Sequence, residues 1–373
     1  MAGIYIHIPY CHKACHYCNF HFSTSLKDIQ EMTDAICKEL LLRKTYLPNL
    51  PIQTIYFGGG TPSVLSADQL NTMLDAIHAI YSVDADAEIT LEANPEDITE
   101  EILQRWKEAG VNRLSIGIQS FQDKRLSWMN RNHTGLEAVQ SVKKAQEAGF
   151  ENISIDLIYG LPGMSVEEWK REIQTAVDLR VPHISSYCLT IEDKTVFGKQ
   201  LQTGLLPEIP EELSESHLLV LMDALQDAGF EQYEISNFCK PSFESRHNSS
   251  YWKREPYVGI GPGAHSYNLI SRHATISNNA LYLQSLHKDI LPISEDPLTD
   301  TDHYHEYVLT RLRTKWGISL EDVHQWIPSY IPIIEKILAQ LQKDGFIVKR
   351  GNVYLLSSKG KLLADEITLK LML

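Results

Sequence analysis

Apolar and polar residues follow two different spacings along the first half of the chain. Short apolar runs with the composition of buried strands cover residues 4–8, 54–57, 88–91, 113–118, 152–158 and 183–189. Longer stretches with apolar residues at helical spacing lie between them, at 26–46, 66–81, 99–109, 135–148 and 166–179. Strands that alternate with amphipathic helices are typical of βαβ units, so the pattern predicts an α/β fold with a parallel sheet.

A weak internal repeat supports this prediction. The segments "KEAGVNRLSIG" (107–117), "QEAGFENISID" (146–156) and "QDAGFEQYEIS" (226–236) share one pattern. Each ends a helix on an acidic residue and alanine, places glycine at the cap, and continues into a strand. The repeat alone suits a barrel and a doubly wound sheet equally well. Six units before residue 190 favour a partial, open (β/α)6 barrel.

The pattern changes after about residue 300. Helices are expected at 304–313, 320–326, 333–343 and 360–371, with a hairpin at 346–356 that turns on Gly351 and Asn352. Three helices and a hairpin predict a small α+β, winged-helix-like domain. Its would-be DNA-recognition helix presents an apolar stripe of core type instead of a basic face, formed by Ile333, Ile334, Ile337, Leu338 and Leu341. A packing or lid domain is therefore favoured over nucleic-acid binding.

The expected organisation is a barrel over 1–235, a connecting segment over 236–300 and the C-terminal domain over 301–373. A formal net charge of −14 argues against a nucleic-acid partner, because phosphates demand clustered Lys and Arg. The start "MAGIYIHIPY" lacks a basic, apolar secretion signal, and no apolar run reaches the length of a membrane-spanning helix. Three of the six cysteines fall within eight positions, which does not suit a disulfide scaffold. These features predict a cytoplasmic protein without a transmembrane segment.

The clustered cysteines are Cys11, Cys15 and Cys18, directly after the first expected strand. A zinc site could take a fourth ligand from His12, His16 or His21, although zinc motifs usually consist of two separated ligand pairs. An iron–sulfur cubane held by three thiolates leaves one iron free for a small chelating molecule. The spacing C-x3-C-x2-C favours the iron–sulfur interpretation over zinc. The other three cysteines, Cys37, Cys188 and Cys239, have no spacing partner and are expected to be buried or idle thiols.

Polar groups stand at the ends of the next strands. "GGGTP" (58–62) follows the second strand, and its glycines would let a ligand approach the backbone closely. Glu92, Gln119 and Asp156 each lie where an apolar strand ends. Because the carboxyl ends of parallel strands meet at one edge, these groups are expected to form one polar pocket, which Arg131 could join as a carboxylate-binding fork.

The cysteine spacing and "GGGTP" resemble the radical S-adenosylmethionine (SAM) superfamily. In that superfamily a reduced cluster breaks a C–S bond of SAM and generates a deoxyadenosyl radical. Together with "EANP", "GVNRLSIGIQSF", "DLIYGLPG" and "SYCLTIE", these motifs resemble the oxygen-independent coproporphyrinogen III oxidase superfamily from about residue 4 to the end. The resemblance implies a [4Fe-4S] cluster on Cys11, Cys15 and Cys18. The SAM contacts that it implies are Tyr5, Tyr17, Gly59, Gly60, Thr61, Glu92, Gln119, Arg131 and Asp156.

Two features point within this superfamily to the haem-chaperone branch. The oxidase branch carries a fourth cysteine two places after the third and a longer N-terminus, whereas this chain has Phe20 there. The motif H-N-x-x-Y-W of the chaperone branch matches His247, Asn248, Tyr251 and Trp252, and imidazole is a common axial ligand of haem iron.

The resemblance therefore implies a haem chaperone that binds haem and delivers it to haem-requiring proteins, plausibly respiratory enzymes at the membrane. The alternatives are an oxygen-independent coproporphyrinogen III oxidase and a radical SAM enzyme with an unrelated substrate. Whether SAM is cleaved productively, and whether the chain is a monomer or a dimer, stay open at this point.

Overall fold

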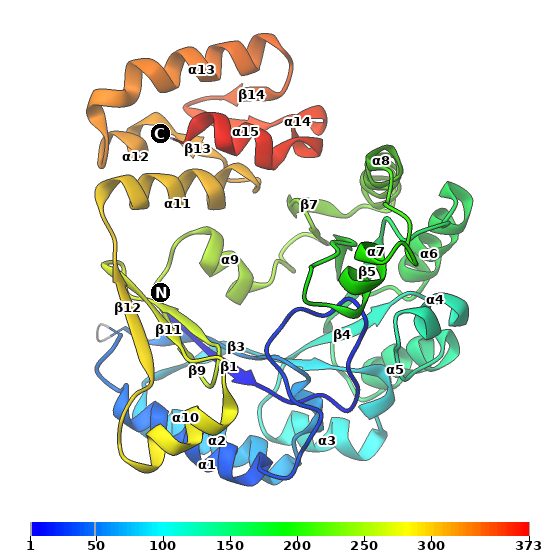
Figure 1. The fold of residues 1–373 in the computed structure, drawn as a ribbon, viewed down its shortest axis with the longest axis vertical. Coiled ribbons are helices and arrows are strands. Elements are labelled where there is room, and N and C mark those ends of the chain that lie inside the picture. The colour runs from blue at the N-terminus through cyan, green and yellow to red at the C-terminus, as the bar shows by residue number, and fades with distance from the viewer. Residues whose placement is uncertain (1, 48–49, 373) are drawn as a thin grey trace.

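The computed structural model describes residues 2–47 and 50–372. Six strands lie side by side in chain order and run parallel, with helices in the connections (Figure 1). The strands are β1 (Ala2–Ile8), β2 (Ile52–Gly59), β3 (Val83–Ala93), β4 (Arg113–Gln119), β5 (Asn152–Tyr159) and β6 (His183–Cys188). The helices between them are α1 (Ile29–Leu42), α2 (Ala67–Ile80), α3 (Glu100–Glu108), α4 (Asp123–Trp128), α5 (Gly135–Glu147) and α6 (Val166–Asp178).

Further strands extend this sheet at both edges. Beyond β6, α7 (Val196–Gln202) and α8 (Glu211–Asp227) precede the antiparallel strands β7 (Glu231–Glu234) and β8 (Asn237–Cys239). At the other edge β9 (Tyr257–Ile260) runs parallel to β1, followed outward by β10 (His265–Tyr267), β11 (Ser271–Thr275) and β12 (Ile293–Pro297), with α10 (Asn279–His287) before β12. The sheet ends on β12 and β7, so the partial barrel is confirmed as open. The segment 236–300, expected as a connection, contributes the strands β8 to β12 to the main sheet.

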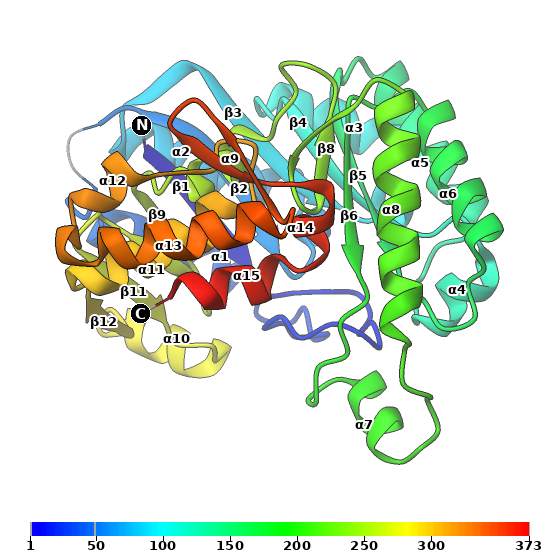
Figure 2. The same cartoon turned by 90° about the horizontal axis from the view of Figure 1, so that it is seen from above.

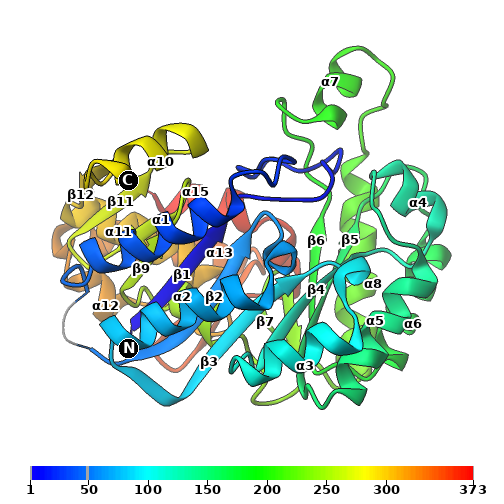
Figure 3. The same cartoon turned by 90° about the horizontal axis from the view of Figure 1, so that it is seen from below.

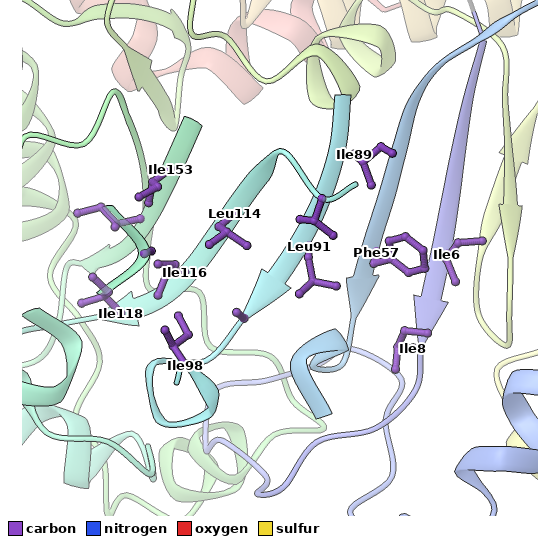
Figure 4. Packing of buried hydrophobic residues seen from close by; sticks show 14 of the residues in the cluster. Ile6, Ile8, Phe57, Ile89, Leu91, Ile98, Leu114, Ile116, Ile118 and Ile153 are labelled. Carbon is purple, nitrogen blue, oxygen red and sulfur yellow. The ribbon is translucent and has the colours of Figure 1, made fainter. Parts of the chain in front are cut away.

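Helices cover the outer face of this sheet, and α7 projects beyond the strand ends beside the N-terminal loop (Figures 2 and 3). Alternate strand residues such as Ile6, Ile8 and Phe57 pack into one apolar core (Figure 4). Their neighbours Tyr5, His7 and Tyr56 lie on the opposite face, because successive side chains of a strand alternate. The inside of the barrel is consequently lined by polar and aromatic groups.

The repeated helix–glycine–strand units form as predicted. Gly110, Gly149 and Gly229 adopt φ values of 94°, 82° and 77°, which favour glycine. The amide of the residue after each glycine returns to a carbonyl in the last helical turn, as in Val111 N to Trp106 O at 3.0 Å. These caps end each helix where the following strand must begin.

A second apolar core lies in the C-terminal domain. Its elements are α11 (Asp300–Leu312), β13 (Ile318–Ser319), α12 (Leu320–His324), α13 (Ile331–Lys343), β14 (Ile347–Arg350), β15 (Val353–Leu356), α14 (Ser358–Leu362) and α15 (Ala364–Leu371). Two details differ from expectation. Ile333 is 48% exposed and does not belong to the buried stripe of α13, and the last helix is broken at Leu363. Ile334, Leu338 and Leu341 are buried in this core, and Ile337 is partly buried against it.

Charged groups join this domain to the barrel. The Arg313 Nε lies 2.7 Å from Glu234 Oε1, and the Arg254 Nη2 lies 3.4 Å from Glu306 Oε2. Between the two parts lies α9 (Arg246–Trp252), which carries the H-N-x-x-Y-W motif (Figure 1). Within the described ranges, every helix is too short or too polar to cross a membrane.

Candidate radical SAM site

A cavity of about 400 Å³, here called the mouth pocket, opens at the carboxyl ends of the barrel strands. The three clustered cysteines line it together with groups from the ends of β2 to β6. Eight of the nine predicted SAM contacts are among its lining residues: Tyr17, Gly59, Gly60, Thr61, Glu92, Gln119, Arg131 and Asp156. The structure therefore brings together residues that are up to 139 positions apart, from Tyr17 to Asp156.

Tyr5 is the predicted contact that does not line the mouth pocket. Its hydroxyl lies 3.1 Å from His7 Nδ1, and its ring stacks on Tyr56 at 6.2 Å between centroids. It thus lies deeper in the barrel, where it supports the residues under the pocket.

The loop that carries the cysteines is held from several sides. The Cys11 amide donates to Ser23 O at 3.0 Å, and the side chain of Asn130 donates to Ala14 O at 2.7 Å. From the projecting α7, the Phe197 amide donates to His16 O at 3.0 Å. The Phe197 ring stacks on Trp128 with centroids 4.1 Å apart. These contacts fix a loop that has little regular structure of its own.

The surroundings of the three cysteines decide the protonation of their thiols. Burial raises the pKa of Cys11 to about 12 and also raises the pKa of Cys18, so without a metal both groups stay protonated. Thr61 Oγ1 donates to Cys11 Sγ at 3.3 Å, and Arg131 Nη1 donates to Cys15 Sγ at 3.4 Å. A metal stabilises thiolates outright, and these two donors would then assist.

The histidines of the zinc alternative are engaged outside the pocket. His12 pairs with Asp97, His16 Nδ1 lies 2.9 Å from Trp128 O, and His21 Nε2 lies 2.8 Å from Asn279 Oδ1. In the described part of the chain, no three His, Cys, Asp or Glu side chains converge closely enough to hold a single metal ion. Three cysteines spread around one pocket suit a multi-iron cluster better than a mononuclear zinc site.

The glycine run fits closely against the strand that precedes the cysteine loop. Gly60 donates to Ile8 O at 2.9 Å, and Thr61 donates to Tyr10 O at 2.7 Å. A Cβ added at Gly60 would lie 2.5 Å from Tyr10 O, and Gly59 has φ of 105°. The glycines therefore serve the joint between β1 and β2 as well as the pocket wall.

Two partly buried carboxyl groups line the pocket. Burial raises the pKa of Glu92 to about 7 and the pKa of Asp156 to about 6. Tyr56 Oη donates to Glu92 Oε1 at 2.7 Å, and Arg131 donates to Asn94 Oδ1 at 2.7 Å. A bound ammonium group would favour the ionised carboxylates, and the guanidinium of Arg131 would suit a carboxylate.

Sequence reasoning missed several lining residues. Asn94 lies two residues after Glu92 in "EANP" and also lines the pocket. Its closeness to the strand-end Glu92 was the signal that could have identified it. Tyr187, Leu189 and Thr190 close the side of the pocket beyond β6. Cys188, expected as an idle thiol, also lines the pocket, because β6 ends there.

The haem-motif histidine lies at the other end of the barrel. The α9 helix packs under β1 and β2, where His247 is fully buried. Its Nδ1 lies 2.8 Å from Thr54 Oγ1 and its Nε2 lies 2.7 Å from Tyr251 Oη. Burial lowers the pKa of His247 to about 3, so the imidazole is neutral, as a metal ligand must be. Both ring nitrogens are hydrogen-bonded, so one of these bonds must be replaced before iron can bind.

The other motif residues take different positions around α9. Glu88 accepts the His247 and Arg246 amides at 3.0 and 3.1 Å and so holds the start of the helix. The guanidinium of Arg313 lies over the Trp252 ring, with Cζ 5.2 Å from the ring centroid. The Asn248 amide donates to Ser245 Oγ at 3.2 Å.

The fold and the mouth pocket define a radical SAM protein. A family model described as the Radical SAM superfamily matches residues 5–176. The solved structure of coproporphyrinogen III oxidase (HemN) from Escherichia coli, described as a radical SAM enzyme, superposes with a TM-score of 0.86. That match covers 100% of this chain and 90% of the oxidase at 22% identity, so it shows the shared fold.

Full-length relatives specify the family more narrowly. The haem chaperone HemW of Bacillus subtilis is 36% identical over 98% of each chain. HemW of Escherichia coli is 31% identical, covering 98% of this chain and 96% of its own. The chain belongs to the HemW family of radical SAM proteins.

Proposed function

We propose that this protein is a haem chaperone that binds haem and passes it to haem-requiring proteins, respiratory enzymes among them. The full-length similarity to proteins named haem chaperones carries the proposal. The H-N-x-x-Y-W motif supports it, since His247 is held neutral beside Tyr251. The expected location is the cytoplasm.

The radical SAM core would hold its cofactors at the mouth pocket. Cys11, Cys15 and Cys18 would bind a [4Fe-4S] cluster, and the strand-end groups that line the pocket would bind SAM. A cluster and SAM bound there would supply one-electron reductive cleavage of the SAM sulfonium, with the electron coming from an external reductant. Phe20 is 72% exposed at the position where the oxidase branch has a fourth cysteine.

The structural likeness to the oxidase favours one alternative, an oxidative decarboxylase of coproporphyrinogen III. A haem titration separates the two functions. Added haem should give a Soret band that shifts or weakens in His247→Ala, and the protein should not restore coproporphyrinogen conversion to an extract without the native oxidase. An unchanged haem spectrum in His247→Ala removes this ligand, and restored conversion overturns the chaperone proposal.

A further inference from the structure

A second cavity, of about 340 Å³, lies at the amino ends of the barrel strands and is here called the basal pocket. Ala2, Gln53 and Thr54 form its barrel side, and Ser249, Ser250 and Lys253 line it from α9. Lys315 and Trp316 close it from the C-terminal domain. The volume falls within the range of small-molecule sites, and the pocket lies at a junction of two parts of the chain, where such sites are common.

Three cations line this pocket, although the whole chain carries a formal charge of −14. They are Arg246, Lys253 and Lys315. Lys315 pairs with Glu244, at 2.6 Å, and with Glu231. Arg246 Nη1 donates to the main-chain carbonyl of Asp86 at 2.6 Å and lies 3.7 Å from the carboxylate of Asp86, whose side chain is 84% exposed. Glu244 is the one acidic residue in the lining, so the described wall has a net charge of +2 at neutral pH. The chemistry of the wall therefore favours an anion.

The pocket also contains an aromatic ring, which Lys253 covers on one face, and an unused hydroxyl. The Lys253 Nζ lies 4.7 Å from the centroid of the Trp316 ring. Ser249 is only 4% exposed, and its Oγ has no hydrogen-bond partner among the described residues. Buried hydroxyls are nearly always paired, so this one points to a ligand group that completes it.

One side chain connects this pocket to the haem-motif histidine. Thr54 lines the basal pocket, and its Oγ1 lies 2.8 Å from His247 Nδ1. A molecule with anionic groups in the pocket would lie beside these cations, with the side chain of Thr54 between it and the imidazole. A tetrapyrrole with acidic side chains combines a flat apolar ring with two carboxylates.

We infer that the basal pocket binds the propionate edge of a porphyrin, with Arg246 and Lys253 as the carboxylate contacts and Ser249 as a hydroxyl donor. This inference rests on the proposed haem function but adds a site separate from the iron ligand. It places the porphyrin at the opposite end of the barrel from the cysteine cluster.

Metal-free protoporphyrin IX tests the site without involving an iron ligand. Its fluorescence is followed during titration of the full chain, in parallel with the dimethyl ester, in which both propionates are capped. Arg246→Gln and Lys253→Gln should each weaken binding of the free acid by about fivefold to tenfold, because a charge-assisted bond is lost. Binding of the ester should stay unchanged. Lys170→Gln, an exposed lysine on α6, is the matched control.

The outcomes separate this inference from the proposed function. If the double variant Arg246→Gln/Lys253→Gln binds the free acid as wild type does, or if acid and ester weaken equally, the basal pocket is not the propionate site. His247→Ala should change the haem spectrum while leaving metal-free binding within about twofold. If His247→Ala changes the haem spectrum but the double variant binds the free acid as wild type does, the proposed chaperone function stands and the basal-pocket inference alone is overturned.

Discussion

Removing one hydroxyl near His247 should lower stability and raise haem affinity together. In Tyr251→Phe the imidazole Nε2 loses its partner at 2.7 Å, while the aromatic ring that packs at 4.9 Å from His247 is kept. His247 is fully buried, so water does not replace the lost bond from outside the fold. The free energy of unfolding should therefore fall by about 1–3 kcal/mol, the usual cost of a buried polar group left unpaired.

The same energy is a cost of haem binding in the wild type. Iron cannot bind Nε2 until the hydrogen bond to Tyr251 is broken, and in Tyr251→Phe that bond is already absent. The dissociation constant for haem should fall about tenfold for each ~1.4 kcal/mol recovered. Unfolding in urea and a haem titration in the Soret region measure the two effects on the same samples.

A matched pair of variants identifies the ligating nitrogen. Thr54→Val removes the partner of Nδ1 at 2.8 Å with almost no change in shape. If Nε2 ligates iron, Tyr251→Phe gains affinity and Thr54→Val does not; the reverse result assigns Nδ1. Tyr304→Phe, which removes the hydroxyl that donates to Leu371 O in the C-terminal domain, should cost stability and leave haem affinity unchanged. Unchanged haem affinity in both Tyr251→Phe and Thr54→Val would refute the reasoning.

Three further predictions concern the mouth pocket. Cys15→Ser should reduce bound iron after anaerobic reconstitution from about four atoms per chain to nearly none, and stoichiometric zinc in the wild type would contradict the cluster assignment. Phe197→Ala should remove about 3–5 kcal/mol of packing from the cysteine loop and Trp128, so the brown absorbance should decay faster in air; an unchanged decay would show that α7 does not support the cluster. Burial raises the pKa of Glu92 to about 7, so the folded chain binds the extra proton and wild-type stability should fall as pH rises from about 5 to 7. Glu92→Gln should reduce that slope in urea unfolding, and part of it should remain because the pKa of Asp156 is also raised, to about 6. A slope equal to the wild type's would assign the titration to another group.

The regular part of the barrel was predictable because its signals are local. Each glycine that follows a helix, such as Gly110, needs a positive φ that few other residues accept, and each strand alternates faces. Strand-end positions such as Glu92, Gln119 and Asp156 then converge by topology alone, because six parallel strands present their carboxyl ends at one edge.

Long-range contacts account for what could not be predicted. The burial of His247 depends on Thr54, 193 residues earlier, and on α9 entering the barrel from below. The spacing of apolar residues near position 247 does not indicate that His247 is buried. The support of the cysteine loop by Phe197 is likewise a contact between segments that have no common pattern. The sequence motif predicts His247 as a haem ligand, whereas only the fold shows that this histidine is closed off.

The closed histidine and the open cysteine pocket are joined by one residue. Tyr56 on β2 donates to Glu92 in the mouth pocket, and its ring stacks on His247 with centroids 5.0 Å apart. Alternate residues of β2 span the distance between the two ends of the barrel. Thr54 contacts the imidazole of His247, Tyr56 contacts both His247 and Glu92, and Gly58 lies against Glu92. Because the polar interior of β2 is shared in this way, the two sites cannot be energetically independent if either moves Tyr56. The side chains of β2 thus connect the histidine of the proposed haem site to the mouth pocket.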